Sequence, residues 1–139
     1  AYPPDGANDF GPYWAGNEGP CPIPGGPPQG GVGQPVTLTF SPRDKVKDGK
    51  LTLTDGTTEV DGWLSAPDKP AVAMFSNNCQ TICFIAKQPL KSKTAYTAKV
   101  TANVNGQPFE KTWRFMTSES NLPPWMQGGR GGGRGRGGP

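Results

Sequence analysis

The sequence contains no histidine among its 139 residues. Histidine is the usual general base of Ser/His/Asp and Cys/His enzymes, and it is the most frequent transition-metal ligand in proteins. Its absence excludes those catalytic arrangements. We therefore predict a chain that is not an enzyme and that has no catalytic residue, no cofactor and no resident metal.

Long apolar runs and blocks of like charge are also absent from the sequence. No stretch approaches the roughly 20 apolar residues that cross a bilayer, so we expect no membrane insertion. The net charge is +3, from 14 basic and 11 acidic residues, and this is too mild for strong electrostatic capture of a partner. The chain starts at Ala1 without a visible signal peptide, and we expect a processed product or an excerpt of a longer protein.

Glycine and proline are scarce only in the middle of the chain. Four of the 21 glycines lie between Pro35 and Gln127, whereas residues 1–34 hold nine glycines and eight prolines, and residues 128–139 hold eight glycines. This distribution predicts three parts. Residues 1–34 form a Pro/Gly-rich coil packed on the domain, residues 35–118 form a domain with one small core, and residues 119–139 form a flexible Gly/Arg-rich tail.

The middle part shows the two-residue alternation of half-buried strands and no helical period. The runs are Val36–Phe40, Ala71–Ser76, Thr81–Lys87 and Thr94–Thr117, the last with a turn at Asn105-Gly106. Residues 50–64 are predicted to form a hairpin that turns at Asp55-Gly56, because a tight turn favours Asp-Gly. The predicted fold class is all-β, an Ig/fibronectin-like antiparallel β-sandwich of about seven strands.

Two details refine this fold. Thr81–Lys87 is apolar on both sides, so it needs a second cover, and we expect the aromatic residues of the N-terminal coil to supply it. Tyr96 follows a polar bend and enters the next predicted strand. We predict a structural tyrosine corner there, in which the phenol bonds to upstream backbone; the alternative is an ordinary core aromatic.

Several stretches together resemble a known module. They are YPPDG (2–6), GNEGPCP (16–22), GQPVTLTF (33–40), TICFIAKQPLKSKTAYTAKV (81–100) and TWRFMTSE (112–119). The pattern resembles the Ig-like domain found C-terminal to the CAP domain (cysteine-rich secretory protein type) in bacterial extracellular proteins. More distantly, it resembles the Ig-like repeats of bacterial surface-layer and adhesion proteins.

The resemblance implies a secreted, non-catalytic spacer or interaction domain at the cell surface, with another protein or a cell-surface polymer as partner. The CAP domain is not in this chain, so none of its cavity residues can be carried over. An accessory role in a larger secreted CAP-type protein or enzyme is an alternative. The Gly/Arg tail is not part of the family's pattern.

The three cysteines allow one disulfide. Cys79 and Cys83 would lie about 13 Å apart along an extended strand, too far for a bridge, and could pair only if residues 79–83 form a turn. Cys83 sits in an apolar run and is predicted to be a small buried residue. We predict a Cys21–Cys79 disulfide that fixes the N-terminal coil to the sandwich, with three free thiols as the alternative.

Three further groups have two interpretations each. Asp55, Glu59 and Asp61 could bind Ca²⁺ in an oxygen-rich loop, but surface charge explains them as well. Trp14, Trp63 and Trp125 could stack on sugar rings or simply pack the ends onto the sandwich. In the tail, Arg130, Arg134 and Arg136 are candidate contacts for a polyanion, through which a nucleic acid or acidic glycan would bind weakly; the alternative is a flexible terminus.

Overall fold

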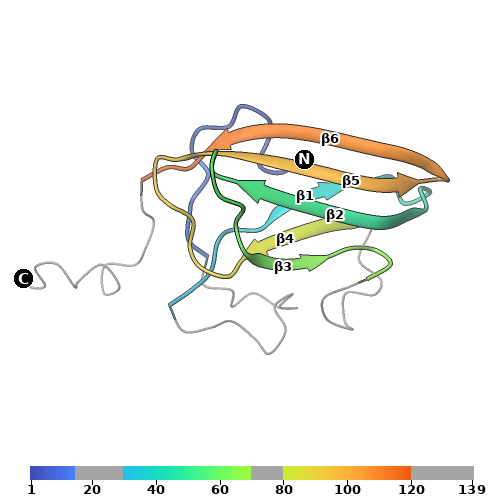
Figure 1. Cartoon of the computed structure of the whole chain (residues 1–139), viewed down its shortest axis with the longest axis horizontal. Helices are drawn as coiled ribbons and strands as arrows, with labels where there is room; N and C mark the ends of the chain where they lie inside the picture. The colour runs from blue at the N-terminus through green and yellow to red at the C-terminus, as the bar shows by residue number, and fades with distance from the viewer. Residues whose placement is uncertain (15–29, 70–79, 120–139) are drawn as a thin grey trace, which may run out of the picture.

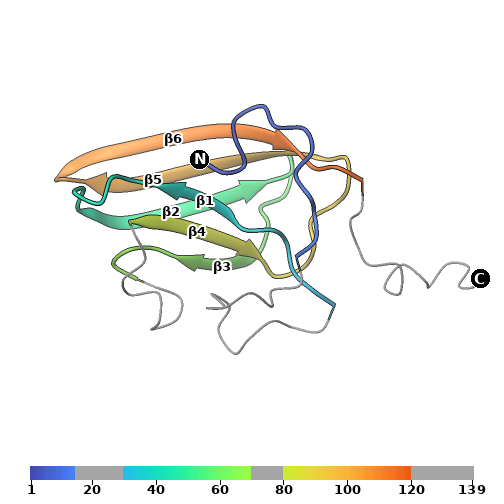
Figure 2. The same cartoon turned by 180° about the vertical axis from the view of Figure 1, so that it is seen from behind.

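The computed structural model describes residues 1–14, 30–69 and 80–119, which form two antiparallel sheets of three strands each (Figure 1, Figure 2). No helix occurs in these residues. Within the same three ranges, nothing has the helical length and apolarity needed to span a bilayer. The strands are β1 (Val36–Thr39), β2 (Val46–Thr54), β3 (Gly62–Ser65), β4 (Thr81–Ala86), β5 (Ala95–Val104) and β6 (Gln107–Met116).

The first sheet has the order β1-β4-β3 and the second has the order β2-β5-β6. The predicted all-β, antiparallel class is confirmed for the described residues, and so is the β5–β6 hairpin, which turns at Asn105-Gly106. The expected strand Ala71–Ser76 lies outside the described residues. The described part of the chain therefore shows six strands.

The predicted hairpin over residues 50–64 forms only as far as Val60. The Asp55-Gly56 turn does form, Thr54 bridges Glu59, and Val60 N–H donates to the Leu53 carbonyl at 2.8 Å, but the pairing stops there. The chain then crosses to the other sheet, where β3 pairs with β4. A turn signal is local, whereas the partner of β3 is set by which sheet buries its side chains.

One core fills the space between the two sheets. Alternate residues of strands from both sheets point into it, as the two-residue period of a strand requires. The second sheet contributes three aromatic rings, Tyr96, Trp113 and Phe115, each at most 3% exposed. Because both sheets bury side chains in the same cluster, they pack face to face.

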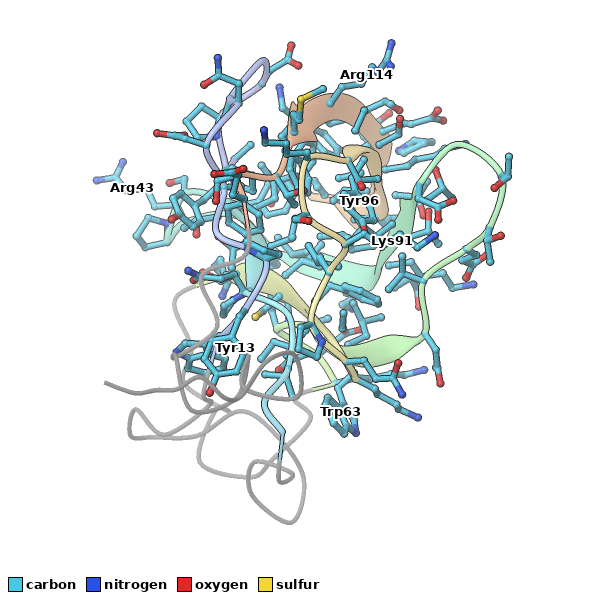
Figure 3. All side chains as sticks on the ribbon, turned by 90° about the vertical axis from the view of Figure 1, so that its left-hand side faces the viewer. Tyr13, Arg43, Trp63, Lys91, Tyr96 and Arg114 are labelled. Carbon is cyan, nitrogen blue, oxygen red and sulfur yellow. The ribbon has the colours of Figure 1, made fainter. Side chains whose placement is uncertain are left out.

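Strand β4 is buried on both of its faces, which explains its continuous apolar sequence. Ile82 and Phe84 point into the main core, whereas Ile85 points outward into a second cluster. Val32 is fully buried in that cluster, and Trp14 packs against it. Part of this outer cover therefore comes from the N-terminal region, and β3 adds Trp63 (Figure 3).

The beginning of the chain forms backbone hydrogen bonds with one edge of each sheet. Tyr2 exchanges two hydrogen bonds of 2.8 Å with Thr37 on β1. Further along, four hydrogen bonds join Gly6, Ala7 and Phe10 to Arg114, Met116 and Ser118 at the end of β6. Unpaired sheet edges are sites of unwanted association, and this segment occupies two of them.

Candidate functional site

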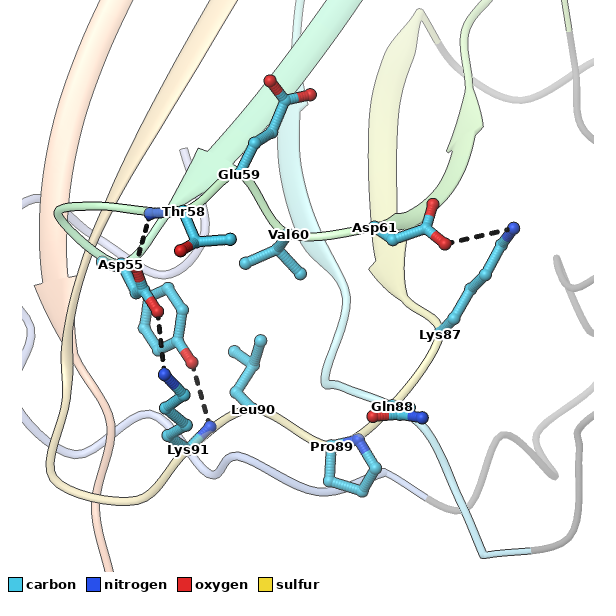
Figure 4. A pocket seen from close by; sticks show the side chains of 11 residues that line it. Asp55, Thr58, Glu59, Val60, Asp61, Lys87, Gln88, Pro89, Leu90 and Lys91 are labelled. Carbon is cyan, nitrogen blue, oxygen red and sulfur yellow. Dashed lines mark hydrogen bonds and ion pairs between the residues drawn. The ribbon is translucent and has the colours of Figure 1, made fainter.

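A pocket of about 520 Å³ lies at one end of the sandwich (Figure 4). Its walls come from residues 55–61, between β2 and β3, and from residues 87–91, between β4 and β5, with Tyr96 completing the lining. Charged side chains surround an apolar floor that includes Val60 and Leu90. It contains both the carboxylates and the tyrosine that the sequence singled out.

Asp55 is the most strongly held charge in this pocket. Its Oδ1 accepts hydrogen bonds from the backbone N–H groups of Thr58 at 2.9 Å and Thr57 at 3.2 Å, and its Oδ2 lies 3.0 Å from Lys91 Nζ. The Thr58 N–H, then the Lys91 ammonium and the Thr57 N–H, lower the pKa of this carboxyl well below its ordinary range. Asp55 is therefore a fixed acceptor at neutral pH rather than an acid or base.

Lys91 joins this carboxylate to Tyr96. The hydrogen bond to Asp55 raises the pKa of the lysine. Its backbone N–H donates to the hydroxyl oxygen of Tyr96 at 2.9 Å, five residues further along the chain. Burial raises the pKa of the tyrosine. The phenol thus bonds to upstream backbone while its ring stacks against Phe115 with centroids 5.9 Å apart.

The connection between β4 and β5 is also held from the other side. The Thr117 hydroxyl donates to the Lys91 carbonyl at 2.6 Å and accepts from Thr94 N–H at 2.9 Å. Leu90 N–H donates to the Pro12 carbonyl at 2.8 Å. The N-terminal region, the β2–β3 connection and the residue after β6 therefore all hold this one crossover. Asp55, Lys91 and Tyr96 in the pocket therefore hold the β2–β3 and β4–β5 connections together.

The carboxylates do not gather into a cation site in the described part of the chain. No three acidic or cysteine side chains there lie close enough to hold a metal ion. Asp55 is paired with Lys91, and Asp61 lies 3.6 Å from Lys87. Glu59 points away from both (Figure 4). These ion pairs can stabilise the two connections, but the carboxylates do not converge their free oxygens on one point, as Ca²⁺ binding requires.

Cys83 lies on β4, between Thr37 on β1 and Ser65 on β3. It is partly buried beside Ile85, and burial raises its pKa to about 11. A thiol that stays protonated is a poor nucleophile. Cys83 is free of any disulfide.

The remaining predicted site residues lie outside the described ranges. They are Cys21 and Cys79 of the predicted disulfide, the candidate stacking residue Trp125, and Arg130, Arg134 and Arg136 of the tail, and they stay predictions. Sequence reasoning missed the pairing of residues 2–10 with two sheet edges. Backbone-to-backbone bonds leave no side-chain pattern, so the sequence carried no signal for it.

Comparison of the chain with protein-family models, with curated proteins and with solved structures finds no match.

Proposed function

We propose that the chain is a non-catalytic, Ig-like module of an extracellular protein, acting as a spacer or an interaction domain at the cell surface. The strand order supports the Ig-like part. An Ig domain of the constant type places strands A, B, E and D in one sheet and C, F and G in the other. Here β1-β4-β3 takes the order B-E-D, and β2-β5-β6 takes the order C-F-G.

The N-terminal segment fits the seventh strand of that scheme. The bridge of Tyr2 to Thr37 is antiparallel and adds strand A beside β1. The bridge of Phe10 to Thr117 is parallel and continues the same segment beside β6, the strand in the G position. Tyr96 lies near the start of β5, the F position, where Ig domains carry their tyrosine corner.

The parallel pairing beside β6 is the observation that carries the spacer role. Residues 6–10 and 114–118 run in the same direction and share four backbone hydrogen bonds. Tension applied before residue 6 and after residue 118 would slide these segments past each other, loading all four bonds together. An antiparallel pair loaded from adjacent ends would open one bond at a time.

A single-molecule pulling experiment tests this proposal. One protein carries handles before Ala1 and after Pro139, and a control carries the second handle in the β5–β6 turn at Gly106. In the control, force acts on the N-terminal ends of both residues 6–10 and residues 114–118. The four hydrogen bonds between these segments then break one after another. We expect a higher unfolding force for the first arrangement, because forced unfolding is governed by the unfolding barrier along the pulling direction. An equal or lower unfolding force for the first arrangement would refute the spacer role.

A further inference from the structure

The outer face of the β2-β5-β6 sheet is polar, and much of it consists of threonine. Alternate residues of these strands point inward to the core, so the intervening ones point outward. The outward threonines are Thr52, Thr54, Thr97, Thr101 and Thr112. Among the outward positions of these three strands there is no aromatic residue. The face therefore offers rows of hydroxyl groups at the regular spacing of a β-sheet.

Three cations cross this face on one diagonal. Lys50 on β2 lies opposite Thr101 on β5, Lys99 follows two residues away on β5, and Arg114 on β6 lies opposite Thr97. Each cation is thus one strand across and two residues along from the next. With strands about 4.8 Å apart and about 3.4 Å per residue, neighbouring cations on the diagonal are about 8 Å apart at Cα. All three residues are exposed, and Arg114 points away from the body of the molecule (Figure 3).

The charge balance on this face is positive. Glu110 is the one acidic residue that the strand register places outward, and it pairs with Lys99 at 3.4 Å; Asp48 is also exposed, at the bulge of β2. Asp5 approaches from the edge, where its carboxylate accepts a hydrogen bond from the backbone N–H of Arg114 at 3.1 Å. Most other described acidic residues lie in turns and loops, such as Asp44, Asp55 and Asp61. Spaced cations among hydroxyls complement a partner whose negative charges repeat along a line.

We propose that this face binds a linear acidic polysaccharide, one whose sugars carry carboxylate or sulfate groups. The cations on the diagonal pair with those groups, and the threonine hydroxyls bond to sugar hydroxyls between them. The proposal names the partner of the interaction module proposed above, and it rests on that function. It is independent of the arginines in the tail.

The face fits a polysaccharide better than a nucleic acid. Proteins that bind single strands stack the bases on aromatic side chains, and the outward positions here supply none. The DNA major groove admits a helix or a two-stranded ribbon, whereas this face is a sheet three strands wide. With Lys47, which lies opposite Asn103 beyond the end of the diagonal, the face has four exposed cations, and four cations give few phosphate contacts.

Binding of the full-length chain to polygalacturonate and to dextran sulfate tests the proposal, with neutral dextran as the baseline. The face variant carries Lys50→Gln, Lys99→Gln and Arg114→Gln. The control variant carries Arg43→Gln, Lys45→Gln and Lys69→Gln, which are exposed residues of the β1–β2 and β3–β4 connections. Each set removes three cations, so both lower the formal net charge from +3 to 0. Thermal unfolding confirms that each variant is folded.

We expect the unmodified chain to bind at least one acidic polymer, and we expect the face variant to bind it about tenfold more weakly, since each exposed ion pair contributes modestly. The control should change binding by less than about threefold, and added salt should weaken binding because exposed charges are screened. A face variant that matches the control, or a chain that binds neither polymer, refutes the proposal.

Two additional measurements separate the other partners. A variant with Arg130→Gln, Arg134→Gln and Arg136→Gln isolates the tail; if it alone loses binding, the face proposal is wrong. A single-stranded oligonucleotide that binds through the face more tightly than either polysaccharide would also refute it. Failure here leaves the pulling experiment unaffected, so the two proposals fail separately.

Discussion

Replacing Tyr96 with phenylalanine tests how much the crossover between β4 and β5 depends on one hydroxyl group. The ring is 2% exposed and packs against Phe115, and Phe retains that packing. The substitution removes only the hydroxyl group, whose oxygen accepts a 2.9 Å hydrogen bond from the backbone N–H of Lys91. A hydrogen bond of this kind contributes about 0.5–1.5 kcal/mol, and leaving a partly buried donor unpaired adds to the loss. The neighbouring Leu90 and Lys93 N–H groups bond to other parts of the chain and restrict any rearrangement. We therefore expect Tyr96→Phe to reduce the free energy of unfolding by about 1–2 kcal/mol.

Denaturant unfolding followed by tryptophan fluorescence measures this change, with the midpoint and slope fitted separately. Tyr2→Phe is the matched control, because it removes the same atom from a side chain that is 51% exposed. The control should alter stability by less than about 0.5 kcal/mol. Equal effects of the two substitutions, or no loss in Tyr96→Phe, would show that the hydroxyl bond does not hold the crossover.

Three further predictions concern Asp55 and the cysteines. The pKa of Asp55 is lowered from an ordinary value of 3.8, so its contribution to stability is complete above that pH and is lost as the pH falls toward the lower folded value. Asp55→Asn should therefore flatten the acid side of a stability-against-pH curve, and an unchanged slope would contradict the assignment. Non-reducing peptide mapping should show Cys21 linked to Cys79. Cys83 should stay unmodified by iodoacetamide in the native protein near neutral pH, because burial raises its pKa to about 11. Detection of three free thiols would exclude the disulfide.

The hairpin of β5 and β6 shows what could be read directly from the sequence. Residues 94–117 alternate between apolar and polar, and Asn105-Gly106 supplies two residues at positive φ, 54° and 82°, for the turn. Both signals are local, so a single pass along the chain finds them. Tyr96 was likewise visible as a candidate corner, but its partner, the Lys91 N–H, appears only in three dimensions.

Nonlocal pairing explains the parts that sequence reasoning missed. Asp55-Gly56 turns as expected, yet β3 pairs with β4 in the other sheet rather than with β2. That pairing depends on how both sheets bury side chains in one core, which no local signal shows. Asp55 and Lys91 are 36 residues apart, and no spacing rule connects them. The edge pairing of residues 2–10 depends on backbone groups that every residue possesses.

The sequence by itself determined the strand content, the apolar faces and the lack of histidine chemistry, because alternation and composition are properties of the chain alone. The tertiary structure decided which strands are neighbours, which edges the N-terminal segment occupies, and that Lys50, Lys99 and Arg114 lie on one diagonal. These features depend on register between distant strands. Register is fixed only when both sheets bury their side chains in one core.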